Sequence, residues 1–422
     1  MKTTLRTPRL TLALLGVTLL PLAACSTKSD GGSGGTEKSG SVKTDIGVSD
    51  DEIRLGALTD LSSPFKAQGL ATTQGNELWA DDVNAAGGIC GRKVTIVSKD
   101  HGYKADSALS LYEGMKGDVA GFVQIFGTPT FGAVKPKLAT DDMLAIPSSL
   151  ASSLLDMPQV LLVGTTYDIE MINGLGYLQQ EGKIADGDTI GHIYVDSEYG
   201  KNAQLGVTAY AQAHSLAVES ASVTGTDNDM TATITAMKAK GVKAIAITLS
   251  PGATASVLLQ SAAQGLDVPI VGNTPTWDTT LLTGNPIETF KNYYRVTAQS
   301  PFGYAESPAA VKVAAAYKAK FADAPIDVVN FGYASAQVYG EALSIACESG
   351  DLTRAGIVQA AAKIKADLGG LTADLDYSTP GAPPTRKVYI EQADAGADGG
   401  LKVLEAGYSA PEAAKYRAPF EK

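Results

Sequence analysis

The sequence predicts an α/β fold made of two doubly wound parallel-sheet lobes, and three observations lead to this prediction. Short apolar segments alternate with longer segments that suit helices, and strands connected through helices form parallel sheets covered on both faces. The alternation runs to about residue 163 and then restarts, which indicates two such sheets. About 380 residues follow a polar N-terminal segment, and that length suits two domains better than one.

The first series begins with an apolar strand over 53–58 and a loop that ends at Pro64. A long helix is expected over 67–86, because Gly87 and Gly88 follow it and glycine commonly terminates helices. Apolar runs and helix-forming segments then alternate along the rest of this series. The sequence predicts further strands over 94–97, 121–126 and 143–146, and helices over 105–115 and 134–141.

The second series has the same character, and a tail follows it. For the second series the sequence predicts strands over 189–195, 217–223, 244–249 and 270–271, and helices over 167–181, 202–213, 230–240 and 254–264. The tail breaks the alternation, and it could return to the first lobe and cross again. For the tail we predict helices over 308–321, 333–348 and 357–365, and strands over 371–376 and 387–390.

The N-terminus has the order of a bacterial export signal. Three basic residues and no acid precede an apolar stretch over 10–22, and small residues follow. The tetrad Leu22-Ala23-Ala24-Cys25 resembles a lipobox, in which cleavage before the cysteine leaves its thiol to carry a lipid. Two alternatives are an ordinary signal peptide and an uncleaved anchor, although about 13 apolar residues are fewer than the ~20 that span a bilayer.

We therefore expect a lipoprotein signal peptide over 1–24, lipidation of Cys25, and a Gly/Ser-rich tether over 25–49. The lipid would hold the protein on the extracytoplasmic face of the cell membrane. Loss of 1–24 removes three positive charges, which changes the net charge from −11 to −14. A chain this acidic repels phosphates, so we expect no nucleic-acid partner.

Two other cysteines, Cys90 and Cys347, remain in the body of the chain. Outside the cytoplasm, two thiols in one chain favour a disulfide, and two buried free thiols are the alternative.

Enzyme motifs are not supported. Ser63-Pro64-Phe65-Lys66 fits Ser-x-x-Lys, but the accompanying motifs of penicillin-interacting enzymes do not follow. His101, His192 and His214 stand singly, and Asp227-Asn228-Asp229 lacks the later glycine and glutamate of a calcium loop. We expect no catalytic residue, metal or cofactor.

Several segments resemble one family in the same order along the chain. These are 53–58, the Asn84-Ala85-Ala86-Gly87-Gly88-Ile89 segment, the turn at 195–200 and the helix start at 333–337. They are similar to the branched-chain amino-acid-binding family, the type I solute-binding proteins of ABC importers. The resemblance implies two lobes joined by three crossovers, with a small ligand between them.

Matching the segments places the first lobe at 50–166 and 298–370, and the second lobe with the hinge return at 167–297 and 371–422. The resemblance implies a monomer that captures a small polar solute by hinge closure and delivers it to an ABC permease and its ATPase. An amino acid or a related carboxylate or amide is the expected solute. The alternative is a sensor module that presents ligand occupancy to a membrane signalling partner.

Ligands of doubly wound sheets bind at the carboxyl ends of the strands, so the loops there are the candidate site. In the first lobe these loops carry hydroxyls and backbone N–H groups that can hold a carboxylate, as the family's loops do. Helix capping is the alternative role for any one of these residues. The candidates are Thr128, Thr130, Ser148, Ser149 and Ala151.

In the second lobe, Tyr199 could cover the ligand with its ring. The family places an acid for the ligand's ammonium near Thr274, and this sequence has a threonine there. Either Asp278 replaces that acid, or the ligand has no ammonium, because an unpaired buried ammonium is unfavourable. Trp277 could stack on the ligand or belong to the core.

Overall fold

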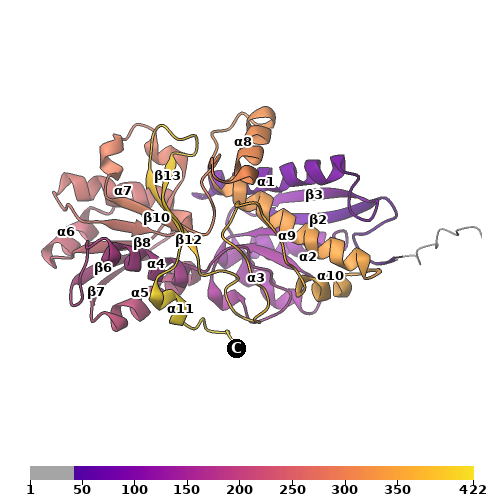
Figure 1. Ribbon diagram of the computed structural model, residues 1–422, viewed down its shortest axis with the longest axis horizontal. Coiled ribbons are helices and arrows are strands. Elements are labelled where there is room, and N and C mark those ends of the chain that lie inside the picture. The colour runs from indigo at the N-terminus through magenta and orange to yellow at the C-terminus, as the bar shows by residue number, and fades with distance from the viewer. Residues whose placement is uncertain (1–41) are drawn as a thin grey trace, which may run out of the picture. The chain divides into compact units, whose positions relative to one another are not determined.

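The computed structural model describes residues 42–422 (Figure 1). The predicted signal peptide over 1–24 and the lipid on Cys25 lie outside the described residues, as does most of the predicted tether. Its last part is held by the body, because strand β1 (Lys43–Thr44) pairs with β11 (Asp351–Leu352). None of the helices within 42–422 has the length and apolar character needed to cross a membrane.

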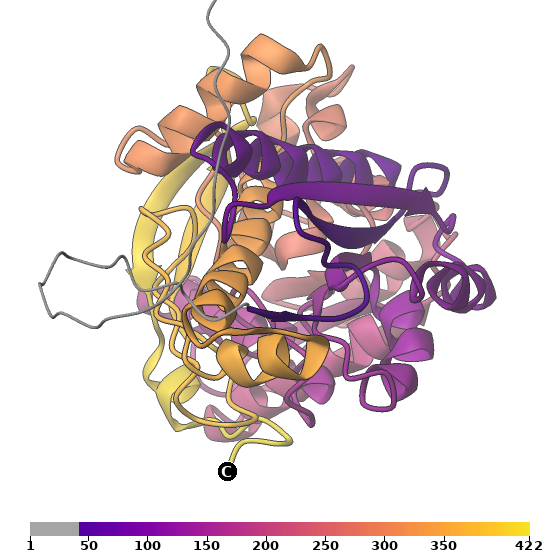
Figure 2. The same ribbon diagram turned by 90° about the vertical axis from the view of Figure 1, so that its right-hand side faces the viewer.

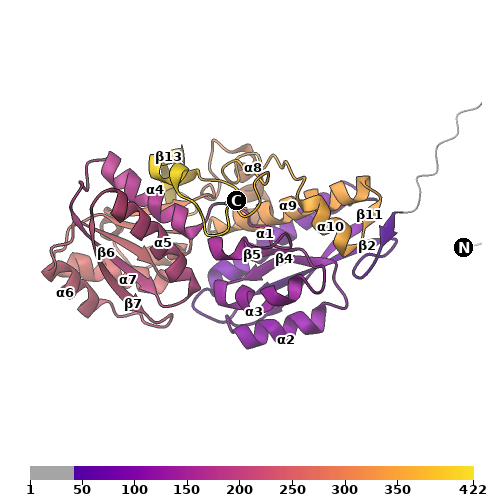
Figure 3. The same ribbon diagram turned by 90° about the horizontal axis from the view of Figure 1, so that it is seen from below.

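The first lobe is built on a four-stranded parallel sheet with the order β3-β2-β4-β5. Helices α2 and α3 lie on one face of this sheet and α1 on the other (Figure 3). The strands and helices are β2 (Glu52–Thr59), α1 (Lys66–Ala85), β3 (Lys93–Asp100), α2 (Ala105–Met115), β4 (Gly121–Phe126), α3 (Thr128–Leu138) and β5 (Ala145–Ser148).

Helix α3 begins six residues before the helix predicted over 134–141. The chain turns sharply at Gly127, whose φ of 94° favours glycine, and Pro129 follows in the first turn, where its missing N–H has no consequence. The segment expected as a loop is therefore the start of a helix, which brings its N-terminal N–H groups to the carboxyl end of β4.

The second lobe is built on a seven-stranded sheet with the order β13-β12-β10-β9-β8-β6-β7. Strands β6 to β10 are parallel, and β12 and β13 are antiparallel additions at one edge. Its elements are α4 (Tyr167–Gln180), β6 (Thr189–Val195), α5 (Glu198–Ala213), β7 (Ala217–Val223), α6 (Thr231–Ala239), β8 (Ala244–Thr248), α7 (Pro251–Ala263), β9 (Ile270–Gly272), β10 (Tyr293–Thr297), β12 (Val388–Ala393) and β13 (Leu401–Tyr408).

Three differences from the sequence prediction lie in this region. Strand β10 was not predicted because Arg295 interrupts its apolar run, and β13 was not predicted because it alternates charged and apolar residues. The strand predicted over 371–376 is wrong, since only an isolated bridge between Gln299 and Thr372 forms there.

The tail returns to the first lobe before it ends in the second. Helices α8 (Pro308–Lys320), α9 (Val328–Glu348) and α10 (Arg354–Ala361) precede the last crossing, and α11 (Pro411–Lys415) packs on α4. Figures 1 and 2 show α9, in orange, beside the indigo and purple elements of the first lobe. The chain thus passes between the two sheets three times, which confirms the predicted fold class.

Helices α1 and α9 approach each other closely at two glycines. A Cβ at Gly75 would lie 2.2 Å from the carbonyl oxygen of Val329, and one at Gly332 would lie 2.1 Å from that of Thr72. Neither position has room for a side chain, so the two helix backbones are in direct contact.

The predicted disulfide is confirmed: Cys90 and Cys347 are bonded, with their Cα atoms 6.0 Å apart. The bond joins the turn after α1 to the last residues of α9 and lies within the first lobe.

His192 is a buried histidine in the middle of β6. Its side chain is fully buried, its Nε2 atom lies 3.3 Å from Thr248 Oγ1, and its ring stacks on Tyr194. Burial lowers the pKa of His192 to about 3. The folded protein therefore holds this imidazole neutral over a pH range in which the unfolded chain protonates it.

This difference predicts a loss of stability in acid. Below the ordinary pKa of 6.5 the unfolded state gains a proton that the folded state does not, so the free energy of unfolding falls as the pH drops toward 3. Between about pH 7.5 and about pH 4.5, the loss from this one residue should be about 2–3 kcal/mol. Urea denaturation of the wild type and of His192→Gln at both pH values tests this, and parallel pH profiles of the two proteins would contradict it.

Candidate functional site

A cavity lies between the two lobes, at the carboxyl ends of strands β4, β5 and β9. It is bounded by the first turns of helices α1, α3, α5 and α9. This is the position at which doubly wound sheets bind ligands. The lining residues are Phe65, Gln68, Tyr103, Phe126, Gly127, Thr128, Ser148, Ser149, Leu150, Tyr167, Tyr199, Thr274, Pro275, Val328 and Phe331.

The walls of this cavity are uncharged. Six of the lining residues are aromatic, and Leu150, Pro275 and Val328 add further apolar surface. The polar side chains among them are hydroxyls and one amide. Within residues 42–422, no carboxylate, ammonium or guanidinium group lines the cavity.

Hydroxyl groups gather at the first-lobe end of the cavity. Thr128 Oγ1 and Ser149 Oγ are 2.7 Å apart, and Ser148 Oγ is buried with no hydrogen-bond partner in the described chain. Burial raises the pKa of Tyr167 well above its ordinary value, so its hydroxyl stays protonated beside Ser149 and Thr128. Together with the N-terminus of α3, these groups can donate hydrogen bonds to a carboxylate.

Aromatic rings form the remaining walls. Tyr199 lies edge-on to Tyr167 with ring centroids 4.8 Å apart, and its hydroxyl donates to Asn273 Oδ1 at 2.7 Å. In the first lobe, Phe65 and Tyr103 stack on each other, with ring centroids 4.9 Å apart. The hydroxyl of Tyr199 is thus already bonded within the second lobe, and the ring of Tyr199 lines the cavity.

Direct contacts hold the lobes together beside the cavity. Gln68 of α1 donates from Nε2 to the carbonyl oxygens of Pro275, at 3.0 Å, and Trp277, at 2.9 Å. These two residues belong to the segment that follows β9 in the second lobe. The first turn of α1 is therefore bonded to the second-lobe wall.

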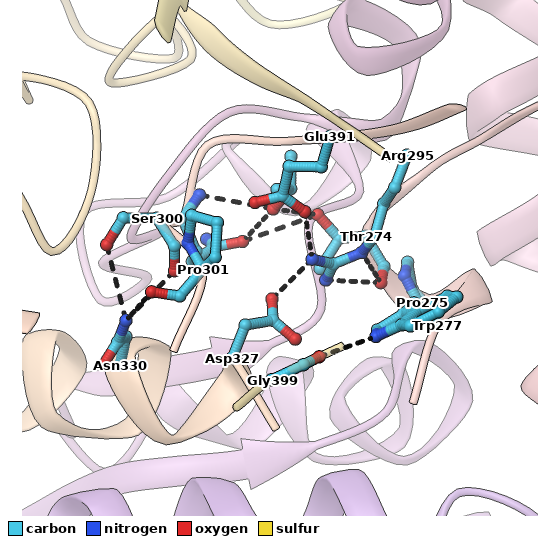
Figure 4. Close-up of polar contacts among 12 residues, drawn as sticks. Thr274, Pro275, Trp277, Arg295, Ser300, Pro301, Asp327, Asn330, Glu391 and Gly399 are labelled. Carbon is cyan, nitrogen blue, oxygen red and sulfur yellow. Dashed lines mark hydrogen bonds and ion pairs between the residues drawn. The ribbon is translucent and has the colours of Figure 1, made fainter. Parts of the chain in front are cut away.

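A buried ion pair links the lobes as well (Figure 4). Arg295 of β10 is fully buried, and its Nη1 atom lies 2.6 Å from Asp327, just before α9, and 2.9 Å from Glu391 of β12. Its Nε and Nη2 atoms donate to the carbonyl oxygen of Thr274, at 3.1 and 2.9 Å. Burial opposes the charge of Arg295, but the two carboxylates outweigh it and raise its pKa, so the guanidinium stays charged.

Five of the nine predicted ligand-binding residues line the cavity: Thr128, Ser148, Ser149, Tyr199 and Thr274. Their role in ligand binding remains a prediction.

The structure places the other four away from the cavity. Thr130 donates to the carbonyl oxygens of Phe126 and Gly127 at the start of α3, so its hydroxyl is bonded to the backbone of the turn. Ala151 is fully buried in the core. Asp278 accepts from Thr280 and caps the 3₁₀ turn η3 (Thr279–Leu282), so its carboxylate does not supply a charge to the cavity.

Trp277 belongs to the core of the second lobe. It is fully buried, stacks on Tyr293, and donates from Nε1 to the carbonyl oxygen of Gly399 at 3.3 Å. The 3₁₀ turn η2 (Thr274–Thr276) presents Thr274 and Pro275 to the cavity. The side chain of Trp277, which follows the turn, points into the core of the second lobe.

Sequence reasoning missed most of the aromatic wall. Phe126 is the last residue of a predicted strand, and Phe65 and Tyr103 lie in loops that follow two others. The rule that ligands bind at the carboxyl ends of the strands, which selected the hydroxyl residues, applies equally to these three aromatic residues. Phe331 had no such signal, because α9 begins five residues before its predicted start.

Comparisons with known proteins agree with this geometry. Residues 52–399 match the model of a family described as periplasmic binding protein, and the chain belongs to that family. A search of curated protein sequences found no match.

Solved structures of this type are similar over most of their length. A fatty acid ABC transporter substrate-binding protein from Thermomonospora curvata is 34% identical, with a TM-score of 0.86 over 90% of this chain and 97% of that one. A branched-chain amino acid ABC transporter protein from Thermus thermophilus with bound valine is 16% identical, with a TM-score of 0.76 over 87% and 99%. A branched-chain amino acid transporter substrate-binding protein from Streptococcus pneumoniae with isoleucine is 21% identical, with a TM-score of 0.70 over 86% and 100%. The last two share the fold.

The ion pair of Arg295 predicts a contrast between two aspartates that both join the lobes. Asp327→Ala should lower the free energy of unfolding by about 2–4 kcal/mol, less than the 3–5 kcal/mol for a fully broken buried pair because Glu391 remains. Asp398→Ala is the matched control, since Asp398 pairs with Lys318 of α8 at an exposed position, and it should change stability by less than about 1 kcal/mol. Equal losses in the two variants, measured by urea denaturation, would contradict the assignment.

Proposed function

We propose that the protein is the substrate-binding component of an ABC importer and that its ligand is a small carboxylic acid with an apolar body and no ammonium group. The observation that carries this proposal is the cavity with hydroxyl donors at one end, aromatic walls and no charged lining residue. The lipid on Cys25 belongs to the proposal on the strength of the sequence alone. It would keep the protein beside its permease, outside the cytoplasm.

The absence of charge around the cavity favours this ligand class. A carboxylate can be held by neutral donors and a helix N-terminus, whereas a desolvated ammonium needs a counter-charge or several acceptors. Asp278, the one acid considered for that purpose from the sequence, is bonded elsewhere. The relative from Thermomonospora curvata, a fatty acid ABC transporter substrate-binding protein by name, supports an apolar carboxylic acid rather than an amino acid.

Capture would follow from closure of the lobes. A carboxylate bound by Thr128 and Ser149 in the first lobe gains contacts with Tyr199 and Pro275 only when the second lobe is close. That differential affinity is what shifts the population toward the closed form. The bonds from Gln68 and the ion pair of Arg295 contribute to the same form.

Three ligands of nearly one shape test the proposed class. Leucine carries both a carboxylate and an ammonium, 4-methylpentanoate only the carboxylate, and 3-methylbutylamine only the ammonium. We expect 4-methylpentanoate to bind, leucine to bind at least about tenfold more weakly, and the amine not to bind, by calorimetry on the purified protein. At ~100 times its Kd, the acid should add about 2.7 kcal/mol to the stability. Tighter binding of leucine than of 4-methylpentanoate would overturn the proposal.

The hydroxyl pair gives a second prediction. Thr128→Val and Ser149→Ala should each weaken the binding of 4-methylpentanoate by about 10–100-fold, because a hydrogen bond to a charged group contributes about 1.5–3 kcal/mol. Ser222→Ala is the control, since Ser222 is exposed on β7, and it should leave the Kd unchanged. An affinity within about twofold of the wild type in both cavity variants would exclude this end of the cavity as the carboxylate site.

A further inference from the structure

Thr274 separates the cavity from a cluster of buried oxygen atoms. Its Oγ1 atom is hydrogen-bonded to Glu170 Oε1 and lies 2.8 Å from Thr297 Oγ1 and 3.5 Å from Gln299 Oε1. Its backbone N–H donates to Glu170 Oε2 at 3.1 Å. Glu170, Thr297 and Gln299 are fully buried, and none of them lines the cavity. The side chain of Thr274 therefore lies between the ligand space and the acceptors to which it is bonded.

The protons of this cluster can be counted. Three short contacts connect Glu170, Thr274, Thr297 and Gln299 in series. Gln299 takes part through its acceptor Oε1, so the two threonines supply only two protons for the three contacts. When Glu170 carries a proton, all three contacts are hydrogen bonds that run in one direction, from Glu170 to Gln299. Burial raises the pKa of Glu170 to about 8, in agreement with a neutral carboxyl.

The surroundings of Glu170 favour its protonated form, chiefly through burial. Asp168 lies two residues before Glu170 on α4 and is bonded to Ser152 and Tyr416. The positive charge of Arg295 opposes part of the rise in the pKa of Glu170. The positive charge of Arg295 is already paired with Asp327 and Glu391. Arg295 is thus engaged by its own two carboxyl groups, and a proton on Glu170 avoids a buried carboxylate with no cation bonded to it in the described chain.

We propose that Thr274 determines the charge specificity of the cavity, because its side chain fills a cation site formed by Glu170, Thr297 and Gln299. The inference rests on the proposed function only in taking the cavity as the ligand site. Removing the side chain of Thr274 would open a path to Glu170, which would release its proton to solvent and pair with a ligand's ammonium. The wild-type chain excludes amino acids and amines because a hydroxyl and a methyl group occupy that place.

Thr274→Ala tests the inference with charged probes. In this variant, 3-methylbutylamine and methylammonium chloride should stabilise the protein in thermal melts relative to equal sodium chloride. The affinity for 3-methylbutylamine should rise at least about tenfold over the wild type.

Two further variants distinguish an effect of the Glu170 charge from a general loss of order in the 3₁₀ turn η2. Thr274→Ala combined with Glu170→Gln should lose the gain for amines, because the amide cannot supply the negative charge. Thr276→Ala alters the same 3₁₀ turn at a buried threonine that bonds to Asn273 and Tyr293 and does not line the cavity. It should leave the preference between amine and acid unchanged.

The outcomes distinguish this inference from the proposed function. No gain for amines in Thr274→Ala, while the wild type binds 4-methylpentanoate, overturns the inference and leaves the proposed function standing. A gain that Glu170→Gln abolishes supports the inference even if the wild type binds none of the three ligands.

A measurement on the intact cluster completes the test if Thr274→Ala does not fold. The infrared difference between the wild type and Glu170→Gln at about pH 6 should contain the band of a protonated carboxyl group, given its raised pKa. A carboxylate band in its place would overturn the inference, since the hydroxyl chain could not then fill the site.

Discussion

Arg295 is a full positive charge in the interior of the protein, and the arrangement around the cavity depends on how that charge is satisfied. Desolvating a guanidinium is unfavourable unless its hydrogen-bond donors and its charge are both matched. Here Asp327, Glu391 and the carbonyl oxygen of Thr274 meet that requirement from three different segments. Because Asp327 precedes α9 and Thr274 begins η2, one side chain is bonded to two segments that line the ligand space.

An uncharged cavity surrounded by buried charges follows from this arrangement. The charged groups are bonded to one another behind the walls, and the surface offered to a ligand consists of rings, hydroxyls and backbone. Such a surface selects ligands by shape and by hydrogen-bond donation. In the proposal above, charge enters the selection at Thr274, which lines the cavity and is bonded to the buried Glu170.

The sequence was sufficient for the layers of the fold and for part of the site. The alternation of strands and helices, together with the rule that ligands lie at the carboxyl ends of strands, identified Thr128 and Ser149. It could not decide which way the side chains after β9 point, because the 3₁₀ turn at Thr274 is set by packing of Trp277 against Tyr293. Local periodicity also missed β10, since a charged residue in a buried strand has its partners far away in the sequence.

Helices α1 and α9 run side by side in the same direction, in contact at Gly75 and Gly332, and each presents its first turn to the cavity. The helix backbones are in contact at these glycines, and the disulfide between Cys90 and Cys347 joins their far ends, so the two helices form one rigid unit. Phe65 and Gln68 on one helix and Val328 and Phe331 on the other then keep a constant spacing when the lobes move. The first lobe therefore presents a binding surface of fixed shape. Differences between ligands would have to be accommodated by the side chains and the position of the second lobe.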